Sequence, residues 1–144
     1  MSRTLKELLA QGAESATAVS APGRPALSHG GLRRLIEATP ARLNSLGLGR
    51  NDRVAIVLDN GPEMATCFIA CASGVASAPL NPSYRADEFE FYLSDLNAKA
   101  LIVARGSASP AIEVALKLGV PVLDLVSDAA QPAGSFTLEP REAR

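Results

Sequence analysis

Residues 79–95 read Pro-Leu-Asn-Pro-Ser-Tyr-Arg-Ala-Asp-Glu-Phe-Glu-Phe-Tyr-Leu-Ser-Asp, a proline-fixed turn followed by an acidic and aromatic helix pattern. The small, apolar run Val75–Ala78 precedes the turn and is typical of a short buried strand. Acidic residues gather where the helix begins, because the helix dipole favours negative charge there. The stretch therefore predicts a strand, a rigid turn and a helix from Asp87 to Leu96.

The same alternation of strand and helix continues on both sides of this stretch. Val54–Leu58 is apolar at every position, as expected of a strand that is buried on both faces. Apolar periodicity, capping residues and glycine stops predict the further elements, which are a helix that starts within 59–63 and ends at 73, strands at 100–104 and 120–126, and a helix at 111–118.

This order of elements predicts an α/β fold with a mostly parallel sheet, right-handed crossovers and helices on both faces. A length of 144 residues fits one domain. Residues 1–126 are predicted to form the folded α/β unit. Residues 127–144 are small, polar and proline-containing, and they are predicted to form a linker or flexible tail.

The amino-terminal part is predicted to contain a helix at 3–11, a loop at 15–25, a short strand at 26–28 and a helix at 32–46. Pro40 lies inside the last of these helices. A proline in a helix interior removes one hydrogen-bond donor and clashes with the preceding turn, at a cost of about 3 kcal/mol. We therefore expect a kink or break near Ala38 and Thr39, with Thr39 as the cap of a second helix.

The composition excludes several classes of function. Hydrophobic residues make up 47% and charged residues 20% of the chain, which is the balance of a globular protein rather than a disordered one. A net charge of −1 without clustered lysine and arginine argues against nucleic acid as a partner. No apolar run is long enough for a membrane span, and no secretion signal is visible, so we expect a cytoplasmic protein.

Few residues suggest a metal site or a nucleophile. Cys67 and Cys71 stand four residues apart in a predicted helix, so we expect them to share a face and pack as small hydrophobes. His29 is the single histidine, which excludes a multi-histidine metal cluster. Ser28 and His29 have no orienting acid nearby, and we interpret the pair as structural. The acids near the start of the helix after residue 86 are explained by the helix dipole.

The turn Asn81–Arg85 is the best candidate for a binding site. It follows a predicted strand at its carboxyl end, where ligands of open α/β sheets tend to bind. In this reading Arg85 meets a phosphate, and Tyr84 stacks on a base or packs on a neighbouring domain. The alternative is a rigid turn whose polar groups only close backbone hydrogen bonds, and the residues alone leave both open.

Several motifs of the chain resemble those of the adenylate-forming, or AMP-binding, acyl-CoA synthetases. The matching segments are Asp52-Arg53-Val54-Ala55-Ile56, Asn60-x-Pro62-Glu63, Gly74 and Pro79-Leu80-Asn81-Pro82. The stretch from Glu88 to Asp95 is most similar to the oxalyl-CoA synthetase branch. The similarity runs from about Leu27 to Leu138. His29 and Gly31 stand where the first family motif has an aromatic residue and an acid, and Pro40 falls where relatives run an unbroken helix.

The resemblance implies an N-terminal structural subdomain of an ATP-dependent carboxylate–CoA ligase, with a place in fatty acid metabolism. The complete enzyme would use ATP, magnesium and CoA to convert an acid into its acyl-CoA through an acyl-adenylate. The phosphate loop, the magnesium acid and the late lysine of the family do not occur in this sequence. We therefore expect the chain to be a fragment that is inactive alone, with no catalytic residue, no metal ligand and no cofactor of its own.

The resemblance also bears on binding and partners. Some CoA-ligase relatives contact a CoA phosphate with an arginine in the turn that matches Asn81–Arg85, so Ser83, Tyr84 and Arg85 are the candidate CoA contacts. The expected partner is the remaining half of the ligase, or a second copy that associates through uncovered apolar surface. The alternative function is a stand-alone, non-catalytic module that docks on a ligase or binds CoA.

Overall fold

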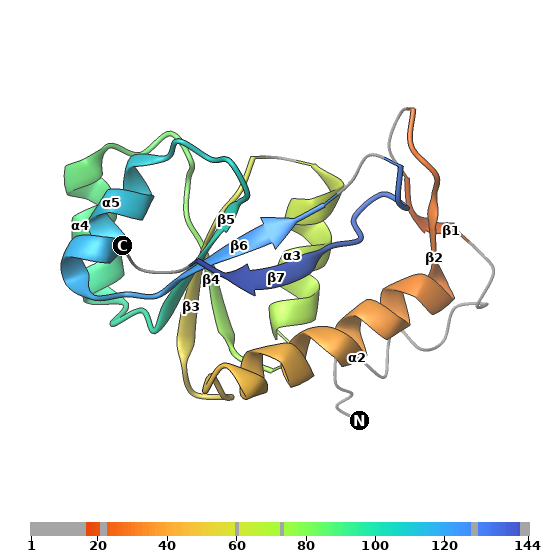
Figure 1. Cartoon of the computed structure of the whole chain (residues 1–144), viewed down its shortest axis with the longest axis horizontal. Coiled ribbons are helices and arrows are strands. Elements are labelled where there is room, and N and C mark those ends of the chain that lie inside the picture. The colour runs from red at the N-terminus through yellow and green to blue at the C-terminus, as the bar shows by residue number, and fades with distance from the viewer. Residues whose placement is uncertain (1–16, 21–22, 60, 73, 128–129, 142–144) are drawn as a thin grey trace, which may run out of the picture.

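A five-stranded sheet with the order β4-β3-β5-β6-β7 forms the centre of the protein (Figure 1). The computed structural model describes residues 17–20, 23–59, 61–72, 74–127 and 130–141, so the helix predicted at 3–11 lies outside the described residues. The strands of the sheet are β3 (Arg53–Val57), β4 (Ala76–Pro79), β5 (Ala100–Ala104), β6 (Val122–Val126) and β7 (Thr137–Pro140).

Four of these strands are parallel, and only β7 is antiparallel to its neighbour β6. The helices that connect the parallel strands are α3 (Pro62–Ala72), α4 (Ala86–Asp95) and α5 (Pro110–Leu118), and α2 (His29–Ser45) precedes them in the chain. This arrangement confirms the predicted α/β fold with a mostly parallel sheet and helices on both faces.

Alternating side chains of the sheet build two separate cores. On β3, Val54 and Ile56 pack with α2 and α3, whereas Ala55 and Val57 pack with α4 and α5. All four are at most 4% exposed, because each face of this central strand is covered by helices. The absence of polar residues from Val54 to Val57 follows directly from this double burial.

The two cysteines belong to the first of these cores. Cys67 and Cys71 are both free and fully buried on α3, with their sulfur atoms 3.8 Å apart. The hydrogen bond between the two thiols, together with burial, raises the pKa of the Cys67 thiol. Both side chains pack as small apolar groups on one face of α3, as the i,i+4 spacing predicts.

A small hairpin leads into α2. β1 (Thr17–Val19) pairs antiparallel with β2 (Leu27–Ser28), so the predicted strand at 26–28 is confirmed, but the predicted loop at 15–25 contains a strand. Ser28 is the N-cap of α2, and its hydroxyl accepts a hydrogen bond of 3.0 Å from the Gly31 amide. The Ser28 hydroxyl thus has a structural role.

The helix α2 does not break at Pro40, so the predicted break with a second helix capped by Thr39 was wrong. α2 is continuous from His29 to Ser45, and Thr39 lies inside it instead of capping a second helix. Pro40 packs directly on Gly74, where a Cβ would lie only 2.7 Å from the Cβ of Pro40. Tertiary packing of α2 on both sides of Pro40, through Ile36 and Leu43, outweighs the local cost of the proline.

The segment predicted as a tail contributes a strand to the sheet. Thr137–Pro140 forms β7, which extends the sheet past residue 126 (Figure 1). Ala133, Phe136 and Leu138 are at most 9% exposed and belong to the interior. The prediction of a tail fails at these positions because a few well-placed apolar side chains are enough to anchor a segment that is polar on average.

Three segments distant in sequence meet at the Glu63 junction, which consists of Arg24, Pro25, Glu63, Thr66, Ala133 and Gly134. The Glu63 carboxylate accepts hydrogen bonds of 2.7 Å from both Arg24 Nη1 and the Gly134 amide. The Thr66 hydroxyl donates to the Gly134 carbonyl at 2.5 Å, and the Ala133 amide donates to the Pro25 carbonyl at 2.7 Å. These bonds fix the chain that leads into β7.

Gly134 cannot carry a side chain in this junction. Its φ is +86°, and a Cβ would lie 2.6 Å from Cγ2 of Thr66. We predict that Gly134→Ala destabilises the protein by about 2–5 kcal/mol, the sum of left-handed backbone strain and overpacking. Gly47→Ala is the matched control, because φ is +87° there and nothing lies within 4 Å. It should cost about 1–2 kcal/mol in urea denaturation, and equal losses would contradict the packing argument.

Pro40 should cost stability even though the helix tolerates it. Pro40→Ala restores the amide that can donate to the Ile36 carbonyl and keeps the Cβ that contacts Gly74. We predict that this substitution raises the free energy of unfolding by about 1–3 kcal/mol. Urea denaturation of the two proteins checks the prediction. A lower midpoint for Pro40→Ala would mean that the ring carbons, rather than the Cβ, hold the contact with Gly74.

Candidate functional site

A crevice opens at the carboxyl ends of β3 and β5. These strands are neighbours, but β3 continues into α3 on one face of the sheet and β5 into α5 on the opposite face. Loops that leave adjacent parallel strands toward opposite faces separate at their start. This divergence creates the position where open α/β sheets bind ligands.

Two adjoining hollows make up the carboxyl-end crevice, which we define by residues 57–59, 79–83 and 104–109. One hollow of about 380 Å³ lies between the end of β3 and the loop after β5, and another of about 530 Å³ lies between the end of β3 and the turn after β4. Leu58, Asp59 and Pro82 line both hollows. The end of β3 therefore forms the floor shared by the two loops.

The predicted turn Asn81–Arg85 lies at this crevice, but its residues differ in their positions. The Asn81 side-chain oxygen accepts a hydrogen bond of 2.9 Å from the Ser83 amide. The backbone carbonyl of Asn81 accepts a hydrogen bond of 3.1 Å from the Tyr84 amide. Ser83 is exposed and lines the crevice. The turn is thus both closed by its own polar groups and placed beside a hollow, so the two alternatives from the sequence are compatible.

Tyr84 packs within its own chain. Its ring stacks on Tyr92 at a centroid distance of 5.0 Å and meets the edge of Phe89 at 5.7 Å. Neither Tyr84 nor Arg85 lines the crevice. The Arg85 side chain is 78% exposed and lies 3.5 Å from both Asp87 and Glu88, so acidic residues at the start of α4 already neutralise it.

The arginine that lines the crevice is Arg105, which was not predicted from the sequence. Arg105 follows β5 directly, lines the crevice and is exposed. Within the described part of the chain, its guanidinium makes no hydrogen bond or ion pair, whereas its amide donates to the Leu125 carbonyl at 3.0 Å. The backbone of Arg105 is therefore fixed while its charge stays available. The signal in the sequence was a cation immediately after a predicted strand.

The loop that carries Arg105 is held by its own serines. The Ser107 hydroxyl accepts from the Ser109 amide at 3.1 Å, and the Ser109 hydroxyl caps α5 by accepting from the Ala111 amide at 3.1 Å. These bonds preorganise the loop before any ligand arrives. On the other wall, Asp59 is exposed at the end of β3 and is the only carboxylate among the residues that line either hollow.

The described residues contain no group of three or more His, Cys, Asp or Glu side chains that could hold a metal ion. His29 stands alone at the start of α2, and its buried Nδ1 has no hydrogen-bond partner. Over the same residues, no helix is long and apolar enough to cross a membrane. The polar side chains that line the crevice include those of Arg105, Ser83 and Ser107.

Comparison with known proteins identifies the family of this fold. The family profile described as AMP-binding enzyme matches residues 7–143. The chain belongs to the AMP-binding enzyme family. The resemblance predicted from its motifs, including the run Pro79–Pro82, is thereby confirmed.

Several curated relatives of this AMP-binding chain are CoA ligases. The chain is 41% identical to the oxalate–CoA ligase of Arabidopsis thaliana over 105 residues, which are 72% of this chain and 20% of that protein. It is 38% identical to the oxalate–CoA ligase of Saccharomyces cerevisiae over 87 residues, 57% of this chain and 16% of that protein. The chain thus spans about a fifth of the length of the relatives it matches, and it resembles their N-terminal part.

Solved structures of ligases share the fold. ATP-bound MatB from Rhodopseudomonas palustris superposes with a TM-score of 0.74 at 21% identity, covering 96% of this chain and 30% of that one. The N-terminal domain of FACL13 from Mycobacterium tuberculosis is 31% identical with a TM-score of 0.53, covering 60% of this chain and 22% of that one. The architecture is that of the N-terminal region of adenylate-forming ligases.

The stacked tyrosines provide a spectroscopic test of the site geometry. A hydrogen bond with the Tyr92 phenol, followed by burial, raises the pKa of Tyr84 above its ordinary value of about 10. The neutral phenol is the favoured form, so this contribution to stability is present below about pH 10 and is lost as the pH rises further.

We predict that absorbance titration resolves one tyrosine with a raised pKa, and that Tyr92→Phe lowers the pKa of Tyr84. The measurement is simple because the chain has two tyrosines and no tryptophan. Phe91→Ala serves as the control, since Phe91 contacts Tyr92 but is no hydrogen-bond partner of Tyr84. An unchanged titration curve of Tyr84 in Tyr92→Phe would contradict the hydrogen bond between the two phenols.

Proposed function

We propose that this chain is the N-terminal structural subdomain of an ATP-dependent carboxylate–CoA ligase, and that its carboxyl-end crevice contacts CoA. The observation that carries the proposal is the free guanidinium of Arg105 at the point where β3 and β5 diverge, in a chain of the AMP-binding family. The relatives named oxalate–CoA ligase support a small dicarboxylate as the acid of the whole enzyme.

The chemistry of the crevice suits the nucleotide end of CoA. That end carries phosphate groups, and an arginine fork binds phosphate oxygens through charge-assisted hydrogen bonds. Arg105 offers such a fork, with the exposed Ser83 on the opposite wall of the crevice. Arg85 is a weaker candidate because Asp87 and Glu88 lie beside it, and Tyr84 contributes by fixing the turn through its stack on Tyr92.

In our proposal, residues outside this chain carry out the steps that use ATP and magnesium. Phosphoryl and adenylyl transfer depend on positioned cations and amides around the reacting phosphates. No phosphate-loop motif with lysine occurs in the sequence, and the lysines present are Lys6, Lys99 and Lys117. We assign magnesium to none of the described side chains, and we expect the isolated chain not to form acyl-adenylates.

Exposed apolar side chains support association with a further part of a ligase. Phe91 on α4 is 63% exposed and Leu116 on α5 is 53% exposed, and α4 and α5 pack against each other. We propose that the remaining part of the enzyme covers such surface in the complete ligase, and that self-association replaces it when the chain is alone.

Isothermal titration of the chain with CoA tests the binding proposal. We expect saturable binding that weakens about ten-fold or more in Arg105→Ala, since a lost charge-assisted contact with phosphate costs about 1.5–3 kcal/mol. Dephospho-CoA should also bind more weakly than CoA. Arg50→Ala is the matched control, because Arg50 is exposed and lies outside the crevice. No heat at about 10 mM CoA would overturn the CoA contact.

Exchange of pyrophosphate into ATP in the presence of oxalate tests the predicted lack of activity. We expect no exchange by the chain alone and restored exchange when the downstream part of an oxalate–CoA ligase is added. Turnover by the purified chain would overturn the structural role. CoA binding without complementation by any downstream part would favour the stand-alone binding module instead.

A further inference from the structure

Asp59 and Arg105 occupy equivalent positions just beyond two neighbouring strands. Val57 on β3 is the register partner of Val103 on β5, and each charged residue follows two places later in its own chain. Opposite charges on neighbouring strands stabilise each other where their side chains meet. Both residues line the same hollow of the carboxyl-end crevice, yet within the part of the chain that the structure describes neither side chain forms an ion pair or a hydrogen bond.

The divergence of the two loops explains why these charges stay unpaired. After β3 the chain continues into α3 on one face of the sheet, and after β5 it continues into α5 on the opposite face. The backbone of Arg105 is held by the hydrogen bond of 3.0 Å from its amide to the Leu125 carbonyl. One positive and one negative side chain thus line a single hollow without satisfying each other.

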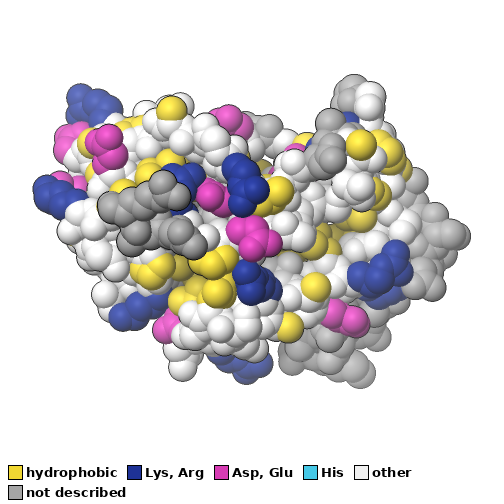
Figure 2. Space-filling view, in the orientation of Figure 1, with side chains coloured by type: hydrophobic (Ala, Val, Ile, Leu, Met, Phe, Trp, Pro, Cys, Tyr) yellow, Lys and Arg dark blue, Asp and Glu magenta, His cyan; other side chains and the backbone are white. Residues whose placement is uncertain are grey.

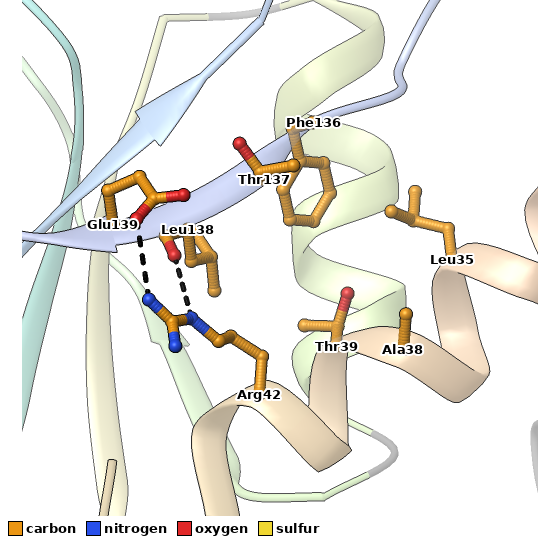
Figure 3. Close-up of a pocket in the computed structure, with 8 residues that line it drawn as sticks. All are labelled: Leu35, Ala38, Thr39, Arg42, Phe136, Thr137, Leu138 and Glu139. Atoms are coloured by element: carbon orange, nitrogen blue, oxygen red, sulfur yellow. Dashed lines mark hydrogen bonds and ion pairs between the residues drawn. The ribbon is translucent and has the colours of Figure 1, made fainter. Parts of the chain in front are cut away.

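The charges beside another hollow of the protein are paired instead. Figure 2 shows positive and negative side chains next to one another on the face that includes β7. A groove between α2 and β7 opens there, and its lining residues Arg42 and Glu139 bind each other, as the dashed lines in Figure 3 mark. That groove offers a ligand no unpaired charge, whereas the carboxyl-end crevice offers one of each sign.

We propose that Asp59 recognises the adenine base of CoA by accepting a hydrogen bond from its exocyclic amino group, while Arg105 binds a phosphate of the same nucleotide. This role of Asp59 rests on the proposed CoA contact of Arg105 and adds the residue that distinguishes the base. An ionised carboxylate only accepts hydrogen bonds. It therefore favours a base edge that donates a hydrogen bond and repels one that presents a carbonyl oxygen at the same place.

The hollow between the two charges has room for a purine ring. Its volume of about 380 Å³ is well above the roughly 150 Å³ of a cavity that holds benzene. Gly106 lines it without a side chain, and a Cβ there would meet no atom within 4 Å, so the space beside it is open. Pro82 and Ala108 also line the hollow and offer apolar surface to the faces of the ring.

Isothermal titration of the whole chain with CoA and with desamino-CoA tests the role of Asp59. Desamino-CoA has the same phosphates, but a carbonyl oxygen replaces the amino group of the base. We expect it to bind about ten-fold or more weakly than CoA, because a charge-assisted hydrogen bond is lost and the oxygen faces a carboxylate. In Asp59→Ala the two affinities should agree within about two-fold. Asp59→Asn, whose amide can also donate to the oxygen, should reduce the difference as well.

Two further variants separate the base contact from the phosphate contact. Arg105→Lys keeps the charge but loses the planar fork, so it should weaken both ligands by the same factor and preserve their ratio. Asp95→Ala removes an exposed carboxylate outside the crevice and should change neither affinity. An unchanged ratio in Asp59→Ala, with CoA still bound, would overturn the role of Asp59 and leave the Arg105 contact intact. No heat from CoA at about 10 mM would overturn both.

Discussion

The Glu63 carboxylate is the constraint on which the arrangement of the chain around the sheet depends. It lies in the first turn of α3 and receives hydrogen bonds from the Arg24 guanidinium and from the backbone amide of Gly134. The three residues come from different parts of the chain. Arg24 lies in the segment before β2, Glu63 in the helix after β3, and Gly134 in the segment before β7. One charged group therefore joins three parts of the chain, and charge-assisted bonds of this kind are stronger than neutral ones. The same junction positions β7 at the edge of the sheet.

Much of the central sheet could be predicted because the sequence of its strands is compatible with few other structures. Val54–Leu58 and Ala100–Ala104 lack polar positions, and such runs suit strands covered on both faces. β7 could not be predicted in this way, since Thr137–Pro140 has one buried residue in four and owes its place to Gly134 and Phe136 upstream. The effect of Pro40 was predicted wrongly for the same reason. Its contact with Gly74 joins α2 to the turn after α3, and such a contact leaves no local signal in the sequence.

The candidate site could likewise be predicted only in part. The turn after β4 could be placed at a carboxyl end from its prolines and its position after a strand, and Ser83 does line the crevice. Arg105 could not be placed, because its approach to the end of β3 depends on the strand order β4-β3-β5, which the sequence does not give. Arg85 was one of the candidate CoA contacts, but Asp87 and Glu88 at the start of α4 lie 3.5 Å from its guanidinium.

The bond from Arg42 to the Leu138 carbonyl also affects how the sheet ends. The Arg141 amide donates to Val122 on β6, so alternation along β7 turns the backbone groups of Leu138 and Pro140 away from β6, toward the open edge. One carbonyl there is occupied by Arg42, and Pro140 has no amide hydrogen to offer. An edge strand with these features is a poor template for a strand of another molecule. The protein is thus protected on this side from edge-to-edge polymerisation into extended β-structure.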